Sequence, residues 1–226
     1  MKIRIISVIL LCVLLAGCAN AQEPQEQPTE SVPVETQGEE TMTAAVICPL
    51  PDTTMEAMDN SVLNISVSQD GFYRDESGRI FLSMQIYSYD QFDMVDISGL
   101  KAGDTILVSG EEISVNSVER NDHGTVLVNG GLDEGGFDLA TDDSGIYYVH
   151  GYSDMKSWNL AGEAQCPVSD AFVFTDAADL DLGEVTYRAE DLLDGIPVPE
   201  YGYQPQNTTV RTENGQVVSM NRIYTP

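Results

Sequence analysis

The chain has 226 residues, of which 37 are Asp or Glu and only 10 are Lys or Arg, so its formal net charge is −27. This charge excludes nucleic acid as a partner, because binding to the phosphate backbone requires clustered basic side chains that displace counterions. Hydrophobic residues make up 42% of the chain, which is enough to build the core of one domain or of two small lobes.

The N-terminal segment combines a short cationic start with an apolar stretch that ends at Leu15. This pattern is typical of a secretory signal, and the stretch is too short for a membrane-spanning helix. The run Leu15-Ala16-Gly17-Cys18 resembles the cleavage motif of bacterial lipoproteins. The resemblance implies a signal peptide over 1–17, lipidation of the Cys18 sulfur, and anchoring to the outer face of the bacterial cell membrane.

The next segment, 18–43, is rich in Glu, Gln and Pro and contains no Lys, Arg or aromatic residue. Such a composition cannot bury enough apolar surface to offset the entropy of ordering. We therefore expect an acidic, disordered tether that follows the lipidated cysteine. The folded extracytoplasmic domain is predicted to span 44–226, either as one body or as two lobes that divide near residue 150.

From residue 44 onward the hydrophobic pattern has a period of two, as in half-buried β-strands. Strands are predicted at 63–68, 79–87, 105–109, 112–118, 125–129, 145–149, 171–175, 208–212 and 216–224. Turn signals separate them, and Asn214-Gly215 is typical of a type I′ hairpin. The predicted helices are few and short, at 53–58, 153–160 and 187–193.

The segment 97–131 has the strongest barrel character. Within it, the Gly103-Asp104 turn leads into the predicted strand at 105–109 and resembles the turns of small SH3-like and OB-like barrels. Short strands at a spacing of about ten residues also favour a closed or two-layered sheet. The predicted fold class is therefore mainly β, an antiparallel small barrel or sandwich with a few short helices.

No nucleotide-binding, zinc-protease or Cys-x-x-Cys motif is present in the sequence. Only two histidines exist, His123 and His150, and we interpret both as surface or strand-end residues. Because acidic residues occur throughout the chain, no glycosidase pair can be selected from the sequence. We therefore expect a protein that is not an enzyme.

A glycine-rich segment around 130–136 is followed by several carboxylates. Asp133, Asp138, Asp142 and Asp143 lie within a short stretch, and oxygen ligands of this kind suit Ca²⁺, the one cofactor considered. A second acidic cluster spans 176–184 but lacks the spacing of an EF-hand. We favour the interpretation of both clusters as solvated acidic loops, with a calcium site as the alternative.

Aromatic side chains gather in one part of the sequence, where Tyr147, Tyr148, Tyr152 and Trp158 fall within twelve positions. Exposed aromatic faces of this kind stack on sugar rings or on peptide side chains. These four residues are therefore the predicted ligand-binding residues. The structural alternative places Trp158 in the core and only one of the two adjacent tyrosines outside.

Two cysteines lie in the predicted folded part, Cys48 and Cys166, and each is followed by proline. In an exported protein they can form one disulfide that closes a long loop. The alternative, two separate buried thiols, stays equally open.

Three hypotheses on function follow from the sequence. The favoured one is a membrane-anchored lipoprotein whose β-domain binds an extracytoplasmic ligand or a protein partner without catalysis. The others are a carboxylate-based hydrolase of glycans or cell wall, and a calcium-stabilised structural module.

Overall fold

The computed structural model describes residues 42–43, 46–47, 55–151, 156–197 and 202–225. All of them belong to one compact unit, Glu39–Pro226. The predicted signal peptide, Cys18 and nearly all of the predicted tether lie outside the described residues, so lipidation and anchoring stay predictions. Within the described ranges, no helix is long and apolar enough to cross a membrane.

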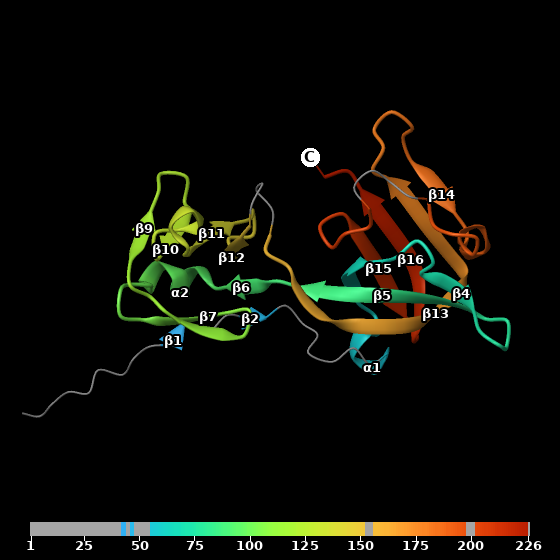
Figure 1. Ribbon diagram of the computed structural model, residues 1–226, viewed down its shortest axis with the longest axis horizontal. Helices are drawn as coiled ribbons and strands as arrows, with labels where there is room; N and C mark the ends of the chain where they lie inside the picture. Colours follow the sequence, from blue (N-terminus) through green and yellow to red (C-terminus); the bar gives the residue numbers. More distant parts are fainter. Residues whose placement is uncertain (1–41, 44–45, 48–54, 152–155, 198–201, 226) are drawn as a thin grey trace, which may run out of the picture. The chain divides into compact units, whose positions relative to one another are not determined.

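The structure is mainly β, as predicted, and its buried apolar side chains form two separate hydrophobic cores. The first core is enclosed by a barrel of five strands (Figure 1). In chain order these strands are β3 (Val62–Ser66), β5 (Ile80–Ser88), β13 (Asn159–Ala177), β15 (Thr208–Glu213) and β16 (Gln216–Ile223).

Around the barrel the strand order is β3-β5-β13-β16-β15, and β15 pairs again with β3. All of these pairs are antiparallel except β13 with β16, which is parallel. Numbered along the chain, the order is first, second, third, fifth and fourth. This connectivity is loosely consistent with an OB-like barrel.

The barrel closes because β13 is long and bent. Its first half pairs with β5, and its second half pairs with β16. Shifts of register occur between Leu160 and Gly162 and between Val168 and Val173. Such irregularities bend a strand and increase its twist, which is how a single strand can serve two sides of a barrel.

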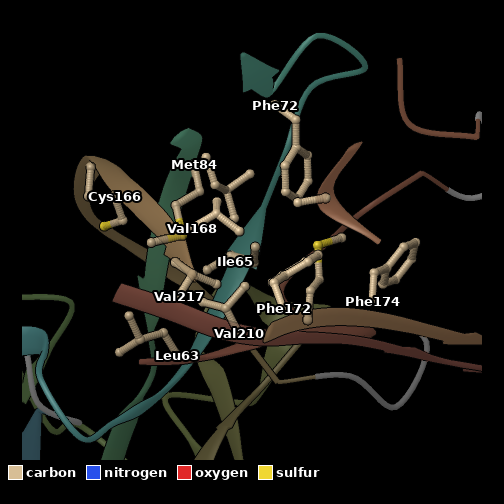
Figure 2. Packing of buried hydrophobic residues seen from close by; sticks show 14 of the residues in the cluster. Leu63, Ile65, Phe72, Met84, Cys166, Val168, Phe172, Phe174, Val210 and Val217 are labelled. Carbon is tan, nitrogen blue, oxygen red and sulfur yellow. The ribbon is translucent and has the colours of Figure 1, made fainter. Parts of the chain in front are cut away.

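Alternation along each strand directs apolar side chains into this barrel. In β5, Leu82, Met84 and Ile86 are buried, whereas Ser83 and Gln85 lie outside and are partly exposed. Figure 2 shows how side chains from all five strands converge in the core. Two short edge strands extend the sheet, β4 (Phe72–Arg74) beside β5 and β14 (Val185–Tyr187) beside β13.

The second core is formed by residues between β5 and β13. Its larger sheet has the order β2-β6-β12-β11-β10-β9, and a smaller sheet has the order β1-β7-β8. The strands are β1 (Met42–Thr43), β2 (Val46–Ile47), β6 (Asp90–Phe92), β7 (Thr105–Val108), β8 (Glu111–Ser114), β9 (Val118–Arg120), β10 (Val126–Val128), β11 (Phe137–Thr141) and β12 (Tyr147–His150).

The segment 97–131, whose turn favoured a barrel, does not itself contribute strands to the five-stranded barrel. That segment supplies β7 to β10 of the second core. The predicted turn does form, since Gly103 has a φ of 96° and β7 pairs with β8. A turn of this kind serves any hairpin, however, whereas barrel closure depends on pairings between distant segments. Met42–Thr43, the last two residues of the predicted tether segment, pair with β7.

The helices are α1 (Met55–Met58), α2 (Met94–Gly99) and the 3-10 turns η1 (Leu132–Glu134) and η3 (Ala189–Leu192). The helix predicted at 153–160 is wrong at its C-terminal end, because Lys156 forms a bridge with His150 and β13 begins at Asn159. The helix at 94–99 was not predicted. Its N-cap is Asp93, whose side chain accepts a hydrogen bond from the Val95 amide over 2.7 Å.

Candidate functional site

The outer wall of the barrel carries a row of hydrogen-bonding side chains on β3 and β5. Ser66 on β3 lies beside Gln85 and Tyr87 on β5, since the two strands are paired. The Ser66 hydroxyl donates to Gln85 Oε1 over 3.1 Å, and the Tyr87 hydroxyl donates to the same oxygen over 3.0 Å. This wall therefore holds a fixed polar cluster rather than independent surface side chains.

The same row continues onto β13, whose first half pairs with β5. Gln85 stands opposite Glu163 in this pairing, and its amide donates to Glu163 Oε1 over 2.9 Å. Nearby, the Tyr73 hydroxyl of β4 donates to Gln165 Oε1 over 2.9 Å. The Gln85 side chain thus links three strands, because its oxygen accepts from β3 and its nitrogen donates to β13.

Three side chains of this row, Ser66, Gln85 and Glu163, line an open hollow of about 300 Å³ on the barrel wall. A second hollow, of about 350 Å³, shares Ser66, Ser68 and Gln85 with it and extends toward Ile196 and Tyr203. We call the two together the wall groove. It is lined by Ser66, Val67, Ser68, Gln69, Ser83, Met84, Gln85, Glu163, Ile196, Pro197, Gly202, Tyr203 and Gln204.

Tyr203 forms the far end of the wall groove and is held firmly. Its hydroxyl donates to the Pro197 carbonyl over 2.7 Å, and its ring lies edge-on to Phe174 with centroids 5.9 Å apart. Burial raises the pKa of the Tyr203 hydroxyl, so this group stays protonated. On its other side, the Arg222 guanidinium lies 5.0 Å from the ring centroid. This end of the groove is therefore preorganised.

Comparison of the chain with protein-family models, with curated proteins and with solved structures finds no match in any of the three. Similarity therefore assigns no substrate or catalytic residue to the wall groove. Its function has to be argued from the chemistry of the side chains that line it.

The predicted aromatic residues are only partly brought together. Tyr148 and Trp158 both contact the ring of Tyr89, which the sequence did not single out. Tyr147, the neighbour of Tyr148 on β12, packs against the second core instead. Tyr152 lies outside the described residues. Tyr147 thus lies against the second core and Tyr148 against Tyr89, whereas ligand binding by these residues stays a prediction.

Two of the four predicted calcium ligands accept hydrogen bonds from nearby backbone amides. Asp138 Oδ1 accepts from the Leu132 amide over 3.1 Å, and Asp142 Oδ1 accepts from the amide and hydroxyl of Ser144. Asp133 and Asp143 are exposed on η1 and on the turn after β11. Among the described residues, no group of three or more Asp, Glu, His or Cys side chains is arranged to hold a metal ion.

Adding millimolar Ca²⁺ to the chelator-treated protein is therefore expected to leave its melting temperature unchanged. A ligand that binds only the native state raises stability, and the raised melting temperature reports it. The measurement is a thermal melt of the full chain in chelator and then in calcium, with Mg²⁺ as the ionic control. An increase in the melting temperature with Ca²⁺ but not with Mg²⁺, absent in Asp138→Asn, would contradict this expectation and support the calcium-stabilised module.

Cys166 lies in β13 and is buried in the barrel core (Figure 2). Cys48 lies outside the described residues, so the predicted disulfide stays a prediction. In the reduced protein, burial raises the pKa of the Cys166 thiol to about 11.

Because the thiolate is the reactive form, we expect reduced, native Cys166 to resist iodoacetamide at about pH 8. It should react as soon as the protein is unfolded. The rate of alkylation, with and without denaturant, tests this expectation, and fast labelling of the native protein would contradict it. Two free sulfhydryls in denatured, non-reduced protein would rule out the disulfide between Cys48 and Cys166.

Proposed function

We propose that this chain is a membrane-anchored extracytoplasmic protein whose barrel binds a hydroxyl-rich ligand, a glycan, in the wall groove without cleaving it. The observation that carries the proposal is the cluster of Ser66, Gln85 and Glu163, which faces an open hollow of about 300 Å³. The lipid anchor and the tether, expected from the sequence, would present this barrel outside the membrane.

The donors and acceptors of the wall groove suit sugar hydroxyls. A serine hydroxyl both donates and accepts, a glutamine amide offers two donors and an acceptor, and a carboxylate accepts. Sugar hydroxyls also do both, so they can replace or extend the existing hydrogen bonds without leaving a buried group unpaired. Hollows of this size fall at the lower end of the range for small-ligand sites.

Binding without hydrolysis is favoured by the number of carboxylates. Most glycoside hydrolases require two, one as the acid and one as the base or nucleophile. Among the described residues that line the wall groove, Glu163 is the single carboxylate. The described lining residues thus hold one of the two carboxylates that the hydrolase hypothesis needs, which favours the non-catalytic function.

The proposal predicts that Gln85→Ala weakens glycan binding at least tenfold, because the substitution removes both the amide donor and the amide acceptor from the groove. A tenfold change corresponds to about 1.4 kcal/mol, a typical value for one or two lost hydrogen bonds. The measurement is titration calorimetry of the full chain against soluble oligomers of N-acetylglucosamine and of neutral hexoses.

Gln216→Ala is the matched control, since Gln216 is an exposed glutamine at the start of β16 and does not line the groove. This variant should bind like the unmodified protein. If none of the oligomers binds, or if Gln85→Ala binds as well as Gln216→Ala, the wall groove is not a glycan site. Mass spectrometry of the oligomers recovered from the titration should show that they are intact. Cleavage products would instead support the hypothesis that the protein is a glycan hydrolase.

A further inference from the structure

Three aromatic rings lie together at one end of the larger sheet of the second core. Tyr89 immediately precedes β6, Tyr148 lies in β12, and Trp158 precedes β13. The Tyr89 ring is edge-on to both of the others, with centroids 6.3 Å from Tyr148 and 5.2 Å from Trp158. The interplanar angles are 87° and 80°. We call these three side chains the aromatic box.

The ammonium group of Lys156 lies against the aromatic box. Its Nζ is 4.0 Å from the ring centroid of Tyr89 and 5.0 Å from that of Tyr148. Both distances are within the range of cation–π attraction. The same Nζ donates a hydrogen bond to the Tyr89 hydroxyl over 2.9 Å. The box therefore already shows the geometry with which proteins recognise an alkylammonium group.

The indole N–H of Trp158 is left without a partner. Its Nε1 is buried and has no hydrogen-bond acceptor among the described residues. Lys156 cannot supply one, because a charged ammonium only donates. A buried donor without an acceptor is unfavourable. A ligand that carries an acceptor next to its ammonium group would accept a hydrogen bond from Trp158 Nε1, which Lys156 cannot do.

We propose that the aromatic box is a binding site for the alkylammonium group of an extracytoplasmic ligand, and that Lys156 occupies it when no ligand is present. The ligand class is a primary amine that also carries an oxygen acceptor. In the complex, the ligand ammonium takes the place of Lys156 against Tyr89 and Tyr148, and the oxygen accepts from Trp158.

The charge of the protein favours such a ligand. The net charge of −27 attracts cations and raises their association rate. Lys156 is able to leave the aromatic box, because a lysine ammonium sits on a flexible stem and is strongly hydrated in water. The aromatic box shares no residue with the wall groove. The proposed ammonium site can therefore be tested independently of the glycan site.

Trp158 is the single tryptophan of the chain, so its fluorescence reports on the box directly. We would titrate the full chain with protonated ethanolamine, which carries both groups, and with ethylene glycol as the neutral control at matched ionic strength. We expect a saturating change with ethanolamine alone. Lys156→Gln should bind at least ten times more tightly than the unmodified chain, because the competing ammonium is gone.

In the Lys156→Gln background, Tyr89→Ala should weaken binding at least tenfold, whereas Tyr224→Ala, at an exposed tyrosine outside the box, should leave it unchanged. Equal affinity of Lys156→Gln and the unmodified chain would overturn the role of Lys156. No response to ethanolamine in either protein, or the same response to ethylene glycol, would overturn the site. If Lys156→Gln does not fold, the titration of the unmodified chain decides.

Discussion

Replacing Arg222 by methionine is expected to lower the free energy of unfolding of the barrel by about 3 to 5 kcal/mol. Arg222 on β16 donates from Nε and Nη2 to the two carboxylate oxygens of Asp176 on β13, over 2.9 and 2.8 Å. Both side chains are at least nine-tenths buried. The substitution leaves the Asp176 carboxylate buried without its counter-charge, which is the costly state.

Urea unfolding followed by circular dichroism measures this loss. Arg211→Met is the control, because Arg211 lies on β15 but pairs with Glu213 at the surface, with 60% of its side chain exposed. Exposed pairs contribute about 0 to 1 kcal/mol, so this control should unfold nearly like the unmodified chain. Adding Asp176→Asn to Arg222→Met should restore part of the stability. Equal losses for Arg222→Met and Arg211→Met would show that the buried pair is unimportant.

Truncation of Phe174 to alanine is the second large effect, with an expected loss of about 3 to 5 kcal/mol. Phe174 is fully buried in β13 (Figure 2), where it stacks on Tyr187 with ring centroids 5.5 Å apart and lies against Tyr203. Removing the ring opens a cavity that neighbouring strands cannot fill. Because Tyr203 ends the wall groove, glycan affinity should fall together with stability.

Phe81→Ala gives the matched comparison. Phe81 lies on the outer side of β5, is only partly buried, and stacks on Tyr73. Its truncation exposes little new core, so the loss of stability in urea unfolding should be clearly smaller than for Phe174→Ala. A loss for Phe81→Ala that equals or exceeds that for Phe174→Ala would contradict the assignment of the barrel interior.

Most strands could be predicted because their pattern is local. Consecutive residues show the apolar alternation of β5 and of β15. They also show the Asn214-Gly215 turn, in which both φ values are positive. The first half of β13 was missed, because its inward residues Ala164 and Cys166 are small, and Gly162 and Pro167 beside them weaken the strand signal. These residues are held in a strand by pairing with β5, a tertiary effect that no local pattern reports.

The two candidate sites could likewise be predicted only in part from local sequence. The wall groove joins Ser66 on β3 to Glu163 on β13, nearly a hundred residues later, through the outward positions of β5. Such positions are ordinary polar strand residues until the barrel closes. The aromatic box was half predicted, since Tyr148 and Trp158 are close in sequence. Tyr89, its central ring, comes from a distant segment.

Glycan binding in the wall groove can be located residue by residue by amide NMR of the full chain titrated with N-acetylglucosamine oligomers and neutral hexose oligomers. We expect chemical-shift changes that saturate and concentrate on Ser66, Gln85, Glu163 and Gln204, all of which line the groove. Changes that concentrate on Tyr148 and Trp158 instead, or no changes with any oligomer, would contradict this expectation.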